Sequence, residues 1–304
     1  MDYDLYHDES KESGYWHGML LVPHSQKQFL LEILDNSRRN IRYSHPVNFK
    51  GVDKSTGKLF SINYSWLSIG VSAIAQKQGK EPLGYFNGKG FNNSLGKTQS
   101  EYEILKEIIG AKFIVMRVRD SHKSIDSTFF PDHASKIETT LRMGLKGGLH
   151  LLSSESDVIN IKSLHFDGYE HYGRNIDKSR IIGRINPLRE HCTIDDNLII
   201  DDRTSIHTKD NAQLYEDCQL LQLTDLLIGA FRTVLGECKN PHQFRISSPV
   251  GELVHKWRNG IARMRNSRWG NGFCISSCWL ENGEWKFDNA LEENRQSGQL
   301  DLGL

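Results

Sequence analysis

Strand-type and helix-type hydrophobic patterns alternate along this chain after an opening hairpin, and this order constrains the possible folds most strongly. The hairpin is predicted from Tyr3–His7 and Tyr15–Val22, which are β-prone and flank the turn-rich segment Asp8–Gly14. Further strand patterns occupy Lys112–Arg119, Val158–Asp167, Ile181–Ile185 and Asn197–Ile200, and a closing hairpin is expected at Gly272–Leu280 and Glu284–Phe287. Helix patterns begin near Ser25 and Ser135 and occupy Asn63–Gln76, Tyr102–Ile109, Gln219–Leu235 and Leu253–Met264, whereas Tyr43–Leu59 reads as a loop. Strands interleaved with helices predict an α/β fold with a mixed β-sheet flanked by helices.

The charges balance overall but are segregated along the chain. The 38 basic and 38 acidic residues give a net charge of zero, which excludes a uniformly basic coat for nucleic acid. Residues 36–60 nevertheless hold six basic side chains and one acidic one, whereas residues 185–217 hold three basic and eight acidic ones. This segregation leaves room for a basic surface beside an acidic region that a metal ion neutralises.

The expected location is the cytoplasm, without membrane contact. No stretch comes close to the roughly 18 apolar residues of a membrane span, and the acidic start Met1–Asp4 does not resemble a secretory signal. Five cysteines, an odd number in a long chain, indicate free thiols in a reducing compartment.

Acidic residues stand where the predicted strands end. Asp8 and Glu9 follow the first strand, Asp167 ends another, and Asp202 follows Asn197–Ile200. Carboxylates that converge at a sheet edge are suitable ligands for Mg²⁺ or Mn²⁺, and two such ions activate water for phosphodiester hydrolysis. The sequence therefore makes these acids candidates for a metal site, although acids at strand ends are also common without any such role.

A further carboxylate, Asp225, lies inside the apolar helix predicted at Gln219–Leu235. Burial of a charged group is costly unless the group is paired, hydrogen-bonded or bound to a metal. Gln222 and Gly229 share its helix face, so this face is polar and small and suits close approach by another element. The alternative is an Asp that pairs with a buried arginine or faces water.

Two of these segments resemble the signatures of a bacterial and phage family called "domain of unknown function 3800". They are Asp8-Glu9-Ser10 and the run from Gln222 through Asp225 to Gly229-Ala230, and the resemblance spans roughly residues 1–236. The chain departs from the family pattern in two places, because Lys11-Glu12-Ser13 separates Ser10 from Gly14 and because Thr224 replaces an alanine.

The resemblance implies a ribonuclease H-like fold whose acids lie on the first strand, a later strand and the last helix. Carried over to this sequence, it implies a metal-dependent site of Asp8, Glu9, Asp167 and Asp225, with Asp202 in reserve, in which Asp8, Asp167 and Asp225 bind Mg²⁺ or Mn²⁺. No motif secures Asp167. The expected domain covers residues 1–288, with a surface insertion at 79–97 and a C-terminal extension at 237–288.

A basic and aromatic segment, His255–Trp269, is a candidate nucleic-acid surface. Arginine and lysine contact phosphates, and tryptophan stacks on unpaired bases. The candidate contacts are Lys256, Trp257, Arg258 and Arg265, together with Lys50 from an earlier loop. The alternative is a solvated helix that its tryptophan anchors to the core.

The last residues resemble the hexapeptide that bacterial replication and repair proteins use to bind the DNA sliding clamp. Flexible chain is expected over 289–304, and the matching residues are Gln299, Leu300, Asp301, Leu302 and Leu304. In that resemblance Gln299 bonds at the pocket rim while Leu302 and Leu304 fill the apolar pocket. The alternative is a tail that packs on its own domain.

Together these features favour a metal-dependent nuclease that cleaves DNA or RNA, recruited to replicating DNA by its tail, in phage defence or a mobile element. The alternative is a non-catalytic interaction protein on the same fold that binds the clamp or a partner enzyme.

Overall fold

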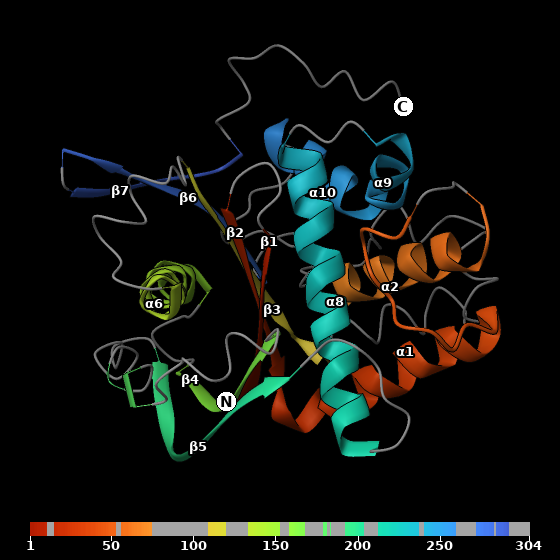
Figure 1. Cartoon of the computed structure of the whole chain (residues 1–304), viewed down its shortest axis with the longest axis horizontal. Helices are drawn as coiled ribbons and strands as arrows, with labels where there is room; N and C mark the ends of the chain where they lie inside the picture. Colours follow the sequence, from red (N-terminus) through yellow and green to blue (C-terminus); the bar gives the residue numbers. More distant parts are fainter. Residues whose placement is uncertain are drawn as a thin grey trace.

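A seven-stranded mixed β-sheet with helices on both faces forms the protein (Figure 1). The computed structural model describes residues 1–10, 15–52, 56–74, 109–119, 133–152, 158–167, 179–180, 183, 192–203, 212–236, 240–259, 272–282 and 284–291. The strands are β1 (Asp2–Ser10), β2 (Tyr15–Pro23), β3 (Lys112–Val118), β4 (Ile159–Asp167), β5 (Cys192–Arg203), β6 (Phe273–Glu281) and β7 (Glu284–Asp288). The helices are η1 (His24–Gln26), α1 (Lys27–Ile41), α2 (Lys58–Ile74), α6 (His133–Leu152), α8 (Ala212–Leu235), α9 (Pro241–Ile246) and α10 (Ser248–Arg258). The prediction of an α/β fold is confirmed.

The strands lie in the order β5-β4-β1-β2-β3-β6-β7. The predicted opening hairpin is confirmed, because β1 pairs with β2 in antiparallel orientation from Tyr3 opposite Pro23 to Ser10 opposite Trp16. On its other side β1 pairs in parallel with β4, which in turn pairs in parallel with β5. The carboxyl ends of β1 and β4 therefore meet at one edge of the sheet.

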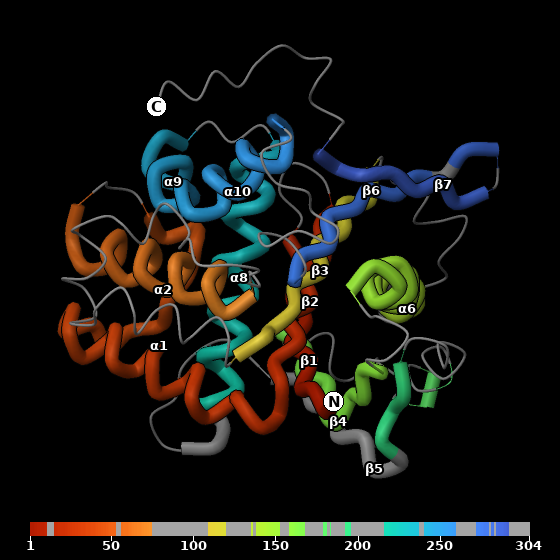
Figure 2. Tube along the Cα trace, turned by 180° about the vertical axis from the view of Figure 1, so that it is seen from behind, coloured from red at the N-terminus to blue at the C-terminus, as the bar shows by residue number. Residues whose placement is uncertain are grey.

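Two apolar layers hold the helices against the sheet. Of the helices that the structure describes, α1, α2, α8, α9 and α10 cover one face and α6 covers the other, as Figure 2 shows from behind. Gly18 of β2 brings α8 close to the sheet, because a Cβ at this position would overlap Ile228 of α8. Since apolar burial stabilises folds at roughly 25 cal/mol per Å², these layers fix the position of α8 over β1.

Helix α8 is the apolar helix of the sequence analysis, and it corrects one expectation. Its segment Glu216–Leu235 is long and apolar enough to cross a membrane by length and composition, although no such stretch was expected. Of that segment, 94% is buried inside the protein. Its apolar character is therefore accounted for by packing against the sheet and the neighbouring helices.

A β-bulge at Lys162 decides which way the end of β4 points. Tyr3 and Asp4 of β1 stand opposite Ile161 and Ser163, so that Lys162 is the extra residue of β4. Before the bulge Ile159 and Ile161 face α6, and after it Leu164 and Phe166 do. Bulges re-aim side chains, and this one turns Ser163, His165 and Asp167 towards the face covered by α8.

Several predicted boundaries are wrong. The loop predicted at Tyr43–Leu59 ends before α2 begins at Lys58, and the strand predicted at Asn197–Ile200 is part of the longer β5. The strand predicted at Ile181–Ile185 is wrong at Gly183, which is helical like Ser179 and Arg180 before it, and the rest of that range lies outside the described residues. Arg180 bonds to α6 through Ser135 and Glu138. The last predicted helix begins earlier, at Ser248, because Pro249 fits the first turn of α10. The insertion at 79–97 lies outside the described residues.

Candidate functional site

Asp8, Asp167 and Asp225 form an acid cluster, contributed by β1, β4 and α8 respectively. Asp8 is buried, and the other two are half-buried. Burial raises the pKa of Asp8 well above its ordinary value, and the negative charges of Asp167 and Asp225 raise it further. The backbone N–H of Glu9 donates to Asp8 Oδ1 at 2.7 Å and lowers this pKa, but the net shift remains upward. The structure therefore places the three predicted metal ligands within electrostatic reach of one another.

Asp225 is tied to a segment that is distant in the sequence. Its Oδ2 accepts a hydrogen bond of 3.0 Å from the backbone N–H of Phe49. Burial raises the pKa of Asp225, this hydrogen bond lowers it, and the charge of Asp167 raises it. The positive charges of Lys50 and Arg232 also lower the pKa, which places both cations within electrostatic reach of the acid cluster.

The spacing of the α8 signature is explained by this same segment, residues 43–52. One turn before Asp225, Gln222 Oε1 accepts bonds from the backbone N–H of Val47 at 2.9 Å and from Arg38 Nη2 at 2.8 Å. One turn after Asp225, a Cβ at Gly229 would overlap the ring of Phe49. The prediction of a polar, small face that another element approaches closely is therefore confirmed, and the 43–52 segment is that element.

Arg232 is a functional candidate that the sequence analysis missed. It is buried, and its Nη1 donates to Ser10 Oγ at 2.9 Å. It lies two helical turns after Asp225 and so shares its face of α8. Arg232 thereby links the end of β1 to α8 beside the acid cluster. The sequence signal for it was a charged residue seven positions after Asp225 in an otherwise apolar helix.

Glu9 is turned away from the other three acids. Successive residues of a strand point to opposite faces, and Tyr15 Oη donates a hydrogen bond to Glu9 Oε2 on the side of α6. There His7 Nε2 lies 2.9 Å from His17 Nδ1, and burial lowers the pKa of His7 to about 4. The charge of Glu9 still raises the pKa of Asp8, so Glu9 acts on the cluster electrostatically from the far face.

The remaining predicted residues differ in how accessible their side chains are. Lys50 is exposed beside the acid cluster. Trp257 is buried with its ring centroid 5.6 Å from that of Phe273, and Arg258 Nε donates to the carbonyl of Leu291 at 3.4 Å. Both contacts match the alternative of a helix anchored to the core, and Lys256 on the same helix is half-buried.

Asp202 stands opposite Phe166 in the β4–β5 register, and nothing is described of its side chain. Arg265 and the clamp-like residues 299–304 lie outside the described residues.

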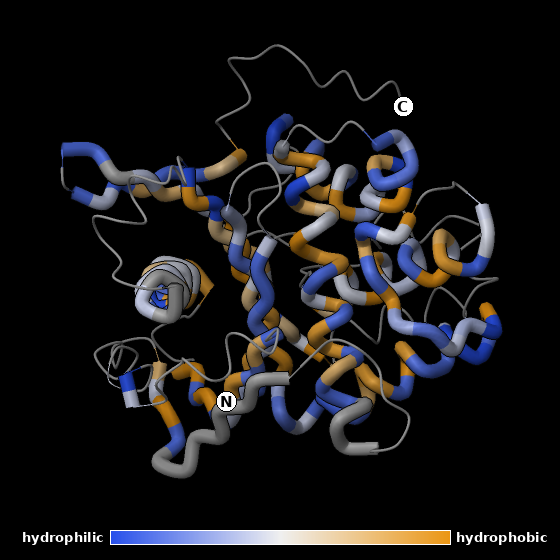
Figure 3. Tube along the Cα trace, viewed as in Figure 1, coloured by the Kyte–Doolittle hydropathy of each residue, from blue (hydrophilic) through white to orange (hydrophobic). Residues whose placement is uncertain are grey.

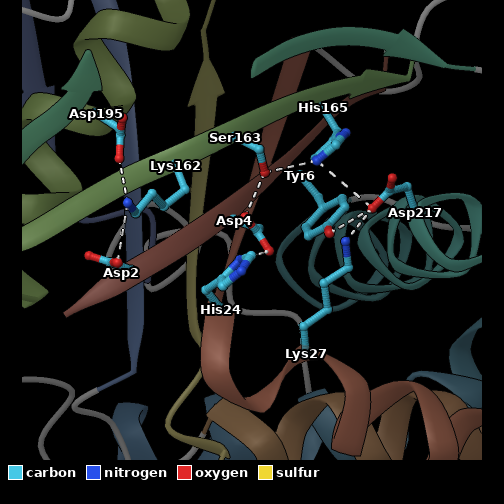
Figure 4. A network of polar contacts seen from close by, with 10 residues as sticks. All are labelled: Asp2, Asp4, Tyr6, His24, Lys27, Lys162, Ser163, His165, Asp195 and Asp217. Carbon is cyan, nitrogen blue, oxygen red and sulfur yellow. Dashed lines mark hydrogen bonds and ion pairs between the residues drawn. The ribbon is translucent and has the colours of Figure 1, made fainter. Parts of the chain in front are cut away.

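A second polar network, drawn in Figure 4, includes Tyr6 of β1 and His165 of β4, each two residues before an acid of the cluster on its strand. Its centre is Asp217 of α8, whose Oδ1 accepts bonds from Lys27 Nζ at 2.7 Å and Tyr6 Oη at 3.0 Å, with His165 Nε2 at 3.8 Å. Burial raises the pKa of Asp217, but the charges of His165 and Lys27 outweigh it and leave the pKa below its ordinary value.

The network continues towards solvent. His165 Nε2 lies 2.9 Å from Ser163 Oγ, which donates to Asp4 Oδ1 at 2.6 Å, and His24 Nδ1 lies 3.0 Å from Asp4 Oδ2. The sequence signal was the run of polar residues at alternate positions in β1 and β4, ahead of Asp8 and Asp167. The network therefore joins β1 to β4 through the bond between Ser163 and Asp4, and joins β1 to α8 through the bond between Tyr6 and Asp217.

The donor chemistry of the acid cluster fits a hard divalent cation. Carboxylate oxygens are the ligands that Mg²⁺ and Mn²⁺ prefer. Within the described residues, no three His, Cys, Asp or Glu side chains stand close enough together to form a metal-binding group in their present positions. The residues therefore match the cation in type, and the three carboxylates must move closer together to bind it.

The chain matches no protein-family model, and comparisons with curated proteins and with solved structures give no match.

Proposed function

We propose that this protein is a metal-dependent nuclease that hydrolyses phosphodiester bonds in DNA or RNA on a ribonuclease H-like core. The observation that carries the proposal is the acid cluster itself, in which the charges of Asp167 and Asp225 raise the pKa of Asp8 and the charge of Asp167 raises the pKa of Asp225. The three acids come from the first strand, a later strand and the long helix that follows β5. That distribution is the one the family resemblance implies.

The arrangement of the sheet supports the same proposal. The first five strands lie in the order β3-β2-β1-β4-β5, with β2 antiparallel to both neighbours and β4 and β5 parallel to β1. This order places β4 directly beside β1, so the strands that carry Asp8 and Asp167 are neighbours in the sheet. Helix α6 connects β3 to β4, and α8 follows β5 and brings Asp225 to the sheet.

In this proposal the residues of the chain have separate tasks. Asp8, Asp167 and Asp225 would hold Mg²⁺ or Mn²⁺, which would supply activation of a water and charge stabilisation of the leaving oxygen. Lys50 provides positive charge for the substrate phosphate beside the cluster, and Arg232 fixes the end of β1 relative to α8. The clamp-like tail recruits the enzyme to replicating DNA, in a cytoplasmic role in phage defence or a mobile element.

A nuclease panel tests the proposal. Single- and double-stranded DNA and RNA are incubated with the full chain and Mg²⁺, Mn²⁺ or EDTA, beside Asp225→Asn and the control Glu32→Gln, which alters an exposed acid of α1. We expect metal-dependent cleavage by the wild type and the control and none by Asp225→Asn. Equal cleavage by Asp225→Asn would refute the assignment of the site. The non-catalytic alternative predicts no cleavage of any substrate.

A further inference from the structure

Five exposed cations lie around the 43–52 segment and form a basic rim, defined here as Arg39, Arg42, Lys50, Lys58 and Arg245. Figure 3 shows hydrophilic residues gathered at the C-terminal end of α1, where Arg39 and Arg42 lie. The rim draws on three parts of the chain, which are the end of α1 with the segment after it, the start of α2, and α9.

Side-chain contacts hold these parts side by side. Arg42 ends α1 in the left-handed conformation, and its carbonyl accepts a bond of 3.1 Å from Lys58 Nζ of α2. Arg245 of α9 lies over the ring of Phe60 of α2, 6.0 Å from its centroid. The three parts of the chain that carry the rim are therefore neighbours in space.

The positive charge of the rim is not cancelled by these contacts. Arg39 Nη2 donates to the amide oxygen of Asn36 at 2.7 Å, Lys58 bonds a carbonyl, and Arg245 lies over an aromatic ring, so each partner is neutral. Among the described residues from 36 to 60 there is no acid. A surface of this kind attracts a polyanion.

The rim leads to the acid cluster through Lys50. Gln222 and Asp225 bind the backbone of the 43–52 segment on either side of Asn48, and this holds Lys50 within electrostatic reach of Asp225. The basic segment of α10 lacks such a route in the described part of the chain, because Trp257 is buried and Arg258 bonds Leu291. Of the candidate nucleic-acid contacts whose side chains are described, Lys50 is therefore the one with a route to the acid cluster.

We propose that the basic rim binds the phosphate backbone of a nucleic-acid strand and leads it across the acid cluster, which rests on the proposed nuclease function. The rim's cations bind phosphates and not bases, so binding is independent of base sequence and strongly dependent on salt.

Binding without turnover tests the rim separately from catalysis. Fluorescence anisotropy of a labelled single-stranded oligonucleotide is measured in EDTA over a range of salt concentrations. The variants are Arg39→Gln with Arg245→Gln, and Lys50→Gln alone. The control is Lys146→Gln, which removes an exposed charge from α6 on the opposite face of the sheet. Circular dichroism and thermal unfolding check that each variant is folded.

The slope of log K against log salt is negative, and we expect it to become shallower by about 0.7 for each phosphate that a variant no longer neutralises. We also expect the affinity of the rim variants for the oligonucleotide to fall several-fold at moderate salt. The control should match the wild type. Binding that is unchanged in both rim variants, or absent in the wild type, would overturn the rim. Loss of binding in the rim variants without any metal-dependent cleavage by the wild type would support the rim and refute the nuclease.

Discussion

The backbone N–H of Phe49 donates to Asp225 Oδ2 at 3.0 Å, which joins the 43–52 segment to the acid cluster. One oxygen of a proposed metal ligand is thereby oriented by a segment that also carries Lys50. The position of this segment and the geometry of the acids are consequently coupled.

Gly229→Ala tests this coupling. A Cβ at Gly229 would overlap the ring of Phe49, so we expect the free energy of unfolding to fall by about 1–3 kcal/mol. The control is Gly147→Ala in α6, where an added Cβ meets nothing within 4 Å. At this exposed helical position alanine should stabilise by about 0.5–1 kcal/mol. Urea unfolding measures both, and equal effects would contradict the docking of Phe49 against α8.

Asp225→Asn should stabilise the protein at neutral pH in EDTA. The pKa of Asp225 is raised in the folded state, so folding favours the protonated form and ionisation destabilises the fold. This penalty is absent below the ordinary pKa of 3.8 and grows as the pH rises through the folded-state pKa. Asparagine removes the charge and still accepts the bond from Phe49, so we expect the free energy of unfolding to rise by about 1 kcal/mol.

The pH dependence of urea unfolding checks this expectation. The gain of Asp225→Asn over the wild type should be full at neutral pH and vanish in acid below 3.8. A variant that is less stable than the wild type at neutral pH would show that Asp225 is stabilised by its surroundings and not strained by them.

The sequence predicted the opening hairpin, α8 and the three acids because each has a local signal. The sequence of β4 also contains a signal for its bulge. Apolar residues alternate at Ile159 and Ile161 and again at Leu164 and Phe166, but two residues separate these pairs where regular alternation would have one. This change of phase is what turns Asp167 towards Asp8. Its meaning depends on the pairing with β1, which is separated from β4 by most of the preceding chain.

The docking of the 43–52 segment was not predictable in the same way. A run with polar and apolar residues in no regular period reads as a loop, and its bonds to Gln222 and Asp225 span more than half of the chain. The network of Asp217 was not predictable for the same reason, because Tyr6 and Lys27 lie far from it in sequence. Trp257 was left open by the sequence, because composition does not tell whether an aromatic side chain is exposed to stack on a base, and its burial matches the alternative of a core anchor.

Asp217→Asn should destabilise the protein with the opposite pH dependence. The pKa of Asp217 is lowered in the folded state, so its ionised form contributes stability above its ordinary pKa of 3.8, and this stability is lost as the pH falls through the folded-state pKa. We expect a cost of about 1–3 kcal/mol at neutral pH that shrinks in strong acid. A cost independent of pH would assign the effect to packing alone. Urea unfolding of both proteins across this pH range distinguishes these outcomes.

A peptide of residues 295–304 should bind the bacterial DNA sliding clamp if the resemblance of its last six residues is functional. Gln299→Ala with Leu302→Ala removes the bond at the pocket rim and one apolar side chain, so we expect binding to be abolished. Fluorescence anisotropy of labelled peptides measures both affinities, and no measurable binding of the unaltered peptide would end the recruitment hypothesis.

The most direct test of the acid cluster is calorimetric titration of the full chain with Mn²⁺ at neutral pH, beside Asp225→Asn and Glu32→Gln. We expect saturable binding by the wild type and by Glu32→Gln. We expect loss of that binding in Asp225→Asn. Identical Mn²⁺ binding by all three proteins, or no binding by the wild type, would contradict the assignment of Asp8, Asp167 and Asp225 as a metal site.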